Sequence, residues 1–113
     1  QTLSNLQVDL HYEWVDVDMD VMIEDTIFRV IQESMTNAVR HGHASRMSLH
    51  FFEDEEDYLI ELQDNGVGFE TLTYGYGLKQ MMERISILGG QLQFESRDGF
   101  FTRVSLPKYK EGR

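Results

Sequence analysis

The stretch 64–69, Asp-Asn-Gly-Val-Gly-Phe, constrains this chain more than any other, because it closely follows the strand-like run 58–62. It places the carboxylate of Asp64 at the end of a rigid element, and the glycines Gly66 and Gly68 let the backbone approach a ligand closely. The same residues are also typical of a plain hairpin turn, which is the alternative for this stretch taken alone. The segments on either side are needed to choose between the two interpretations.

The composition of the chain restricts its class. It has 113 residues, of which 41% are hydrophobic, enough for one domain with a single core. It has no long apolar run and no signal-peptide pattern, and the absence of cysteine excludes disulfides and cysteine nucleophiles. The first residue is not Met. We therefore expect a cytoplasmic domain excised from a longer protein, spanning 1–107, with a basic, disordered tail over 108–113.

The charge of the chain restricts its ligands. Its net charge is −10, from 20 acidic and 10 basic residues. Such a surface repels nucleic-acid phosphates, so we expect no nucleic-acid partner. An anionic ligand would need a local exception, made of a few basic side chains, backbone N–H groups or a metal ion.

Apolar and polar residues alternate where strands are predicted, and apolar residues recur at three- and four-residue spacing where helices are predicted. The predicted strands are 6–14, 46–53, 58–62, 91–96 and 100–106, with hairpin turns at 53–57 and 97–99 and helices at 21–41 and 77–88. This order predicts an α+β fold, a two-layer α/β sandwich whose mixed sheet of about five strands carries the helices on one face. We expect the first strand to bury its apolar side.

Three alternate acids, Asp16, Asp18 and Asp20, precede the long helix. Carboxylates at such a position cap free backbone N–H groups and interact favourably with the helix dipole. Alternate acids also occur in calcium loops, but the glycine and the closing glutamate of that pattern are missing here. We therefore interpret these residues as helix caps.

The long helix carries polar residues beside its apolar stripe. Glu33, Asn37 and Arg40 lie at i, i+4 and i+7, so they share one face of the helix. One interpretation is a solvated Glu–Arg flank. The other is the wall of a site that holds an acid, a neutral oxygen ligand and a cation. An Asn carbonyl suits Mg²⁺, which also binds phosphate oxygens.

The second helix begins with Gly75 and Gly77, one residue apart. Glycines at a helix start offer free backbone N–H groups and the positive end of the helix dipole to an anion. Lys79, in the first turn, adds a positive charge. The alternative is a flexible loop before an ordinary helix start.

These three candidate parts of an anion site suit one ligand, a purine nucleotide. Asp64 would accept a hydrogen bond from the adenine amino group. Asn37 would hold Mg²⁺ on the phosphates. The Gly75–Gly77 backbone and Arg40 would receive phosphate oxygens.

Three stretches of the sequence resemble the conserved boxes of a known family. Residues 33–41, Glu-Ser-Met-Thr-Asn-Ala-Val-Arg-His, resemble the N box of the GHKL (Bergerat-fold) ATPases. Residues 64–69 resemble the G1 box, and residues 75–78, Gly-Tyr-Gly-Leu, the G2 box. The order and spacing match over nearly the whole chain, and three boxes in register are specific. Within the superfamily the chain is similar to the ATP-binding domain of a sensor histidine kinase, and residues 81–90 are similar to the NarL-type subfamily, whose lids are short.

The resemblance implies that the chain binds Mg-ATP and donates the γ-phosphoryl group to a histidine on a separate dimerisation domain. It implies that Asp64 recognises adenine and that Asn37 ligates Mg²⁺. The implied catalytic residues are Glu33 and Arg40. Glu33 stands at the position of an acid that orients or polarises a water or phosphate in some of these enzymes, and Arg40 lies near the phosphates. The implied nucleotide-binding residues are Asn37, Arg40, His41, Asp64, Gly66, Gly68, Gly75, Tyr76, Gly77, Leu78 and Lys79.

The resemblance also implies partners. They are the protein's own dimerisation and phosphoacceptor helices, which lie outside this sequence, and a response regulator. The full-length protein is then a homodimeric, membrane-anchored sensor kinase whose ATP-binding domain is cytoplasmic and does not touch the membrane. None of the four histidines, His11, His41, His43 and His50, lies in a motif that resembles the phosphoacceptor. Three alternatives remain open: an anti-sigma-factor serine kinase of the same superfamily, a gyrase- or chaperone-type ATPase, and a nucleotide-sensing or interaction module without turnover.

The sequence departs from the family at three positions. Phe100 stands where the family has a Thr that supports the adenine-binding Asp. Support for Asp64 must then come from elsewhere, or the base is held differently. Gln80 and Met82 stand where the NarL-type subfamily has Gly and Arg.

Overall fold

The computed structural model describes residues 6–14, 18–40, 43–67 and 76–108 of the chain. The elements are β1 Gln7–Tyr12, α1 Val21–Arg40, β2 Arg46–Glu53, β3 Asp57–Asp64, α2 Tyr76–Ile87, β4 Gln91–Ser96 and β5 Phe100–Pro107. Their types and order are those that the periodicity predicts. Neither of the two helices in these segments is long and apolar enough to cross a membrane.

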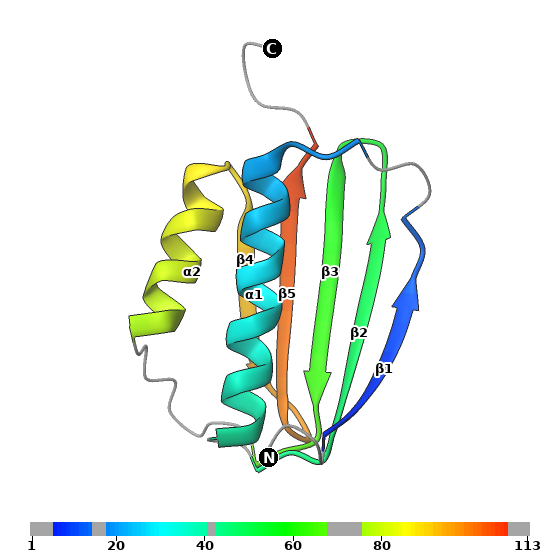
Figure 1. The fold of residues 1–113 in the computed structure, drawn as a ribbon, viewed down its shortest axis with the longest axis vertical. Helices are drawn as coiled ribbons and strands as arrows, with labels where there is room; N and C mark the ends of the chain where they lie inside the picture. Colours follow the sequence, from blue (N-terminus) through cyan, green and yellow to red (C-terminus); the bar gives the residue numbers. More distant parts are fainter. Residues whose placement is uncertain (1–5, 15–17, 41–42, 68–75, 109–113) are drawn as a thin grey trace.

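The five strands form one sheet in the order β1-β2-β3-β5-β4. β1 pairs with β2 in parallel, and the other neighbours pair antiparallel. Figure 1 shows α1 and α2 on the same face of this sheet, with α1 in front of β5 and α2 beside it. The predicted α+β sandwich with a mixed five-stranded sheet is therefore confirmed.

The core lies between the helices and the sheet. Val30 of α1, Ile60 of β3 and Leu106 of β5 are completely buried, and α2 contributes Met81 and Ile85. These side chains come from the apolar stripe of each helix and from one alternate set of each strand, as amphipathic elements require. α1 starts where a side chain caps it, since Oδ1 of Asp20 accepts the N–H of Met22 at 2.7 Å. Of the other predicted caps, Asp18 is exposed and Asp16 lies outside the described residues.

The prediction that the first strand buries its apolar side is wrong. Val8, Leu10 and Tyr12 of β1 are 42%, 60% and 58% exposed, although their neighbours in register on β2 are buried. β1 is the edge strand, and α1 lies over β5, away from most of it (Figure 1). At the end of β1, Tyr12 faces α1 across an open pocket that Glu24 and Ile27 also line. Alternation in a sequence indicates which side of a strand is apolar, and only the tertiary structure decides whether that side is covered.

The tail prediction is wrong at its first residue. Nζ of Lys108 lies 2.6 Å from Oε1 of Glu53. The backbone N–H of Lys108 donates to the carbonyl of Glu56. These contacts attach the end of β5 to the hairpin between β2 and β3. Residues 109–113 lie outside the described part of the chain.

Candidate functional site

The predicted site parts lie toward one end of the strands. At the lower end of Figure 1, β3 and α1 finish and β5 begins, whereas α2 begins higher up, beside the lower half of α1. Antiparallel pairing of β3 with β5 brings the last residue of one close to the first residue of the other. Asp64 therefore lies at this end of the sheet, and the start of α2 lies against α1.

Asp64 is the last residue of β3, and it is only 5% exposed. Its Oδ1 accepts the backbone N–H of Gly66 at 2.9 Å and that of Phe100 at 3.0 Å. Both bonds use the same oxygen, so Oδ2 accepts no hydrogen bond from the described residues. The carboxylate is therefore held in one orientation with one oxygen left for another donor.

The support for Asp64 comes from the backbone of Phe100, not from a threonine hydroxyl. The side chain of Phe100 points elsewhere and stacks on Phe94, with ring centroids 5.3 Å apart. Gly99, with φ of 127°, lies so close to Asp64 that a Cβ there would overlap with the carbonyl oxygen of Asp64. Sequence reasoning missed this support, although a glycine directly before the strand was a signal for close backbone approach.

Asn65 fixes the turn that follows Asp64. Its Oδ1 accepts the N–H groups of Ser45 and Arg46, both at 2.9 Å, and its own N–H donates to the carbonyl of Arg46. Asn65 is part of the motif at 64–69, but no role was predicted for its side chain. The structure assigns it the task of attaching the end of β3 to the start of β2.

Glu33 and Gly77 bring the face of α1 into contact with the start of α2. A Cβ at Gly77 would overlap with the carboxyl group of Glu33. Two of the predicted parts are thus in contact, and a side chain at the second residue of α2 would require the carboxyl of Glu33 to move. A close approach of this kind explains the glycine better than a flexible loop does.

Comparison with known proteins decides the family of this fold and site. Residues 22–110 match the family described as histidine kinase-, DNA gyrase B-, and HSP90-like ATPase. The chain belongs to this ATPase family. The ATPase domain is 34% identical over 98 residues to the sensor protein VraS of Staphylococcus epidermidis, and equally to that of Staphylococcus aureus. Each alignment covers 84% of this chain and 28% of the relative, so the chain spans little more than a quarter of these proteins.

Solved structures share the fold of the ATPase domain. The histidine kinase domain of the blue-light activated kinase of Erythrobacter litoralis EL346 superposes with a TM-score of 0.78 at 19% identity, covering 92% of this chain and 52% of that one. The histidine kinase AdeS of Acinetobacter baumannii gives 0.75 at 21% identity, covering 94% and 56%. These structures confirm the fold, and the family match and the VraS alignments confirm the expected ATP-binding domain of a sensor histidine kinase.

The remaining predicted residues lie in the second half of α1 and the first turn of α2, where the structure describes them. Asn37 is half-buried, one turn of α1 beyond Glu33, and Arg40 is exposed at the last position of α1. Leu78 is a core residue at 4% exposure, whereas Lys79 is exposed. Tyr76 opens α2. Three of the predicted residues lie outside the described part of the chain: His41, Gly68 and Gly75.

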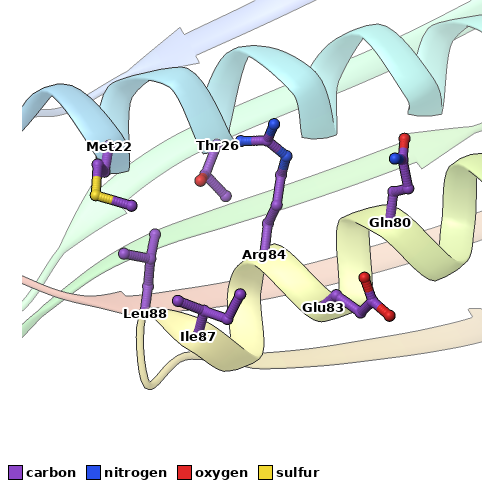
Figure 2. A pocket seen from close by; sticks show the side chains of 7 residues that line it. All are labelled: Met22, Thr26, Gln80, Glu83, Arg84, Ile87 and Leu88. Carbon is purple, nitrogen blue, oxygen red and sulfur yellow. The ribbon is translucent and has the colours of Figure 1, made fainter.

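A cavity of about 310 Å³ lies between α1 and α2, away from the residues described above. Figure 2 shows Met22 and Thr26 of α1 facing Arg84 of α2 and Leu88, the residue after α2, across it. Nη1 of Arg84 lies 2.9 Å from Oδ2 of Asp25, so an ion pair ties the two helices together here. None of the predicted nucleotide-binding residues lines this cavity, which we assign to helix packing.

Proposed function

We propose that this domain binds Mg-ATP at the edge where Asp64, Asn37 and the start of α2 meet. The γ-phosphoryl group of the bound ATP then passes to a histidine on a separate dimerisation domain of a NarL-type sensor kinase. The observation that carries the proposal is the orientation of Asp64, a nearly buried carboxylate fixed by two backbone N–H groups. The family match supports a nucleotide as the ligand.

Asp64 selects the base in this proposal. A carboxylate only accepts hydrogen bonds, and adenine presents an amino group where guanine presents a carbonyl oxygen. Guanine would place an acceptor against an acceptor in a site with little water. A site of this kind discriminates strongly, because the wrong ligand leaves buried polar groups unpaired.

The phosphate end depends on a metal ion, since the domain has a net charge of −10. Among the described residues no group of three or more acidic or histidine side chains could hold a metal. The carbonyl oxygen of Asn37 supplies one ligand for Mg²⁺, and phosphate oxygens and water supply the others, as is usual for Mg²⁺ bound with nucleotides. Arg40 and Lys79 add positive charge, and Glu33 orients the start of α2 or a water there.

The acceptor histidine lies on the dimerisation helices of the full-length protein. Those helices make the kinase a homodimer, and a response regulator receives the phosphoryl group from them. The described domain supplies positioning and charge neutralisation, which are the main contributions of a protein to phosphoryl transfer. The whole kinase is a membrane-anchored sensor with this domain in the cytoplasm.

Calorimetric titration of the chain with ATP, with and without Mg²⁺, tests the proposal, with GTP as the control. We expect binding of ATP that Mg²⁺ strengthens and that GTP does not reproduce. Equal binding of both nucleotides would remove Asp64 from its role, and no binding at millimolar ATP would overturn the proposal. Incorporation of labelled phosphate into the isolated chain would contradict the separate acceptor.

A further inference from the structure

No strand among the described residues pairs with the outer edge of β1. On its inner edge, the N–H group of Gln7 donates to the carbonyl of Ser45, just before β2, at 2.9 Å, and that of Glu13 donates to Phe51 of β2 at 2.7 Å. Backbone groups alternate in direction along a strand, so those of the even-numbered residues point away from β2. The residues with outward-pointing N–H and C=O groups are Val8, Leu10 and Tyr12.

The same three residues carry the exposed apolar side chains of β1, between 42% and 60% exposed. An edge strand with free backbone groups and an apolar side is a template for pairing with another strand. We propose that β1 pairs antiparallel with β1 of a second copy, with Leu10 opposite the second copy's Leu10. This inference does not depend on nucleotide binding.

Symmetry limits the possible registers. A two-fold axis between antiparallel strands passes through one directly opposed pair, so one residue must face its own copy. A register centred on Asp9 opposes two carboxylates. A register centred on His11 places Asp9 opposite the second copy's Glu13, which again opposes two carboxylates.

Of these three registers at the centre of β1, the one centred on Leu10 opposes no two carboxylates and is complementary on both sides of the sheet. On the apolar side it places Val8 opposite the second copy's Tyr12. On the other side it places Asp9 opposite the second copy's His11, twice by symmetry. Asp9 and His11 form a non-hydrogen-bonded pair in this register, in which side chains approach most closely.

The surroundings of these residues leave the contact accessible. Oδ2 of Asp9 lies 3.7 Å from Nε of Arg46, a pair about half exposed on each side. The exposed ring of His11 meets the ring of His50 edge-on at 6.0 Å. Nε2 of His50 in turn lies 2.6 Å from Oε2 of Glu13, so His50 already has a partner within its own copy.

The net charge of −10 on each copy opposes association, and added salt weakens that repulsion.

Sedimentation equilibrium of the 113-residue chain, up to about 1 mM protein in about 0.3 M NaCl, tests the proposal. We expect a monomer–dimer equilibrium. Leu10→Lys puts two ammonium groups on the axis and weakens dimerisation about tenfold or more. Gln93→Lys on the opposite edge strand is the matched control and leaves the equilibrium unchanged. Circular dichroism of each variant checks that it is folded.

A charge exchange tests the register. His11→Asp opposes two carboxylates and weakens the dimer, and adding Asp9→His to it restores opposite partners and the dimer. A chain that stays monomeric over the whole range, or a dimer that Leu10→Lys leaves unchanged, overturns the proposal. A dimer that the exchange does not restore overturns the register.

Discussion

The backbone N–H of Phe100 donates to Oδ1 of Asp64 at 3.0 Å, joining the first residue of β5 to the last residue of β3. A backbone donor is independent of the side chain that follows it. The departure from the family at position 100 therefore leaves the carboxylate supported, and the side chain is free to serve the packing around β4.

The first prediction concerns that departure. Phe100→Thr should leave ATP affinity within about threefold of the parent, which is within about 0.7 kcal/mol. The variant should lose about 1–3 kcal/mol of unfolding free energy, because Phe100 is 9% exposed and stacks on Phe94. Calorimetry and urea denaturation measure the two effects. A large gain in affinity would show that the backbone bond is not enough.

The second prediction concerns the base. Asp64→Asn keeps an oxygen that can accept the N–H groups of Gly66 and Phe100, but it loses the charge and an acceptor. We expect ATP affinity to fall about 10- to 100-fold, the usual cost of losing a hydrogen bond to a charged group. Asp54→Asn, at the opposite end of the sheet, is the matched control and should bind ATP like the parent. Unchanged affinity in Asp64→Asn would exclude Asp64 from base recognition.

The third prediction concerns the contact between α1 and α2. Gly77→Ala should displace the carboxyl of Glu33, which its methyl group would overlap, and because that carboxyl ends a flexible side chain the variant should lose less than about 1 kcal/mol. In the Glu33→Ala background nothing has to move, so the same change at Gly77 should stabilise the helix by about 0.5–1 kcal/mol, and the two changes should be coupled. Ser86→Ala, on the exposed side of α2, controls for helix propensity. Additive unfolding free energies in urea would mean that the two residues are not coupled.

The fourth prediction concerns pH. Backbone N–H bonds from Asp57 and then Glu56 lower the pKa of Asp54 from its ordinary 3.8. A lowered pKa in the folded state means that the carboxylate stabilises the hairpin above pH 3.8, and that this contribution is lost as the pH falls through the folded value. NMR titration of the side-chain carboxyl should give a midpoint below 3.8. A midpoint at or above that value would contradict the bonds at the tip.

The periodic elements were predictable because their signals are local. The bounds of β2 agree with the prediction, because apolar and polar residues alternate along it. α1 starts where it was expected, because a capping residue and an apolar stripe mark it in the sequence. β3 runs further than predicted, because Asp64 pairs with Met47 of β2. Pairing partners are remote in sequence and leave no pattern in the strand itself.

The candidate site was predictable in its side chains and not in its supports. Asp64 and Glu33 could be named as candidates because a motif contains them. The N–H of Phe100 was not found, since every residue but proline carries the same donor and nothing in the sequence marks the one in use. The exposure of Leu10 was missed for a related reason, because a covering element is a property of the whole fold.

The two ends of the candidate site are built in different ways. Hydrogen bonds attach Asp64 to β5, and Asn65 attaches the same turn to β2, so the base end is part of a three-strand framework. The start of α2 has a steric fit against Glu33. If the nucleotide binds as proposed, a shift of α2 relative to α1 would change the contacts of the phosphates while those of the base stayed in place. The domain could then release a product from one end without first losing the other.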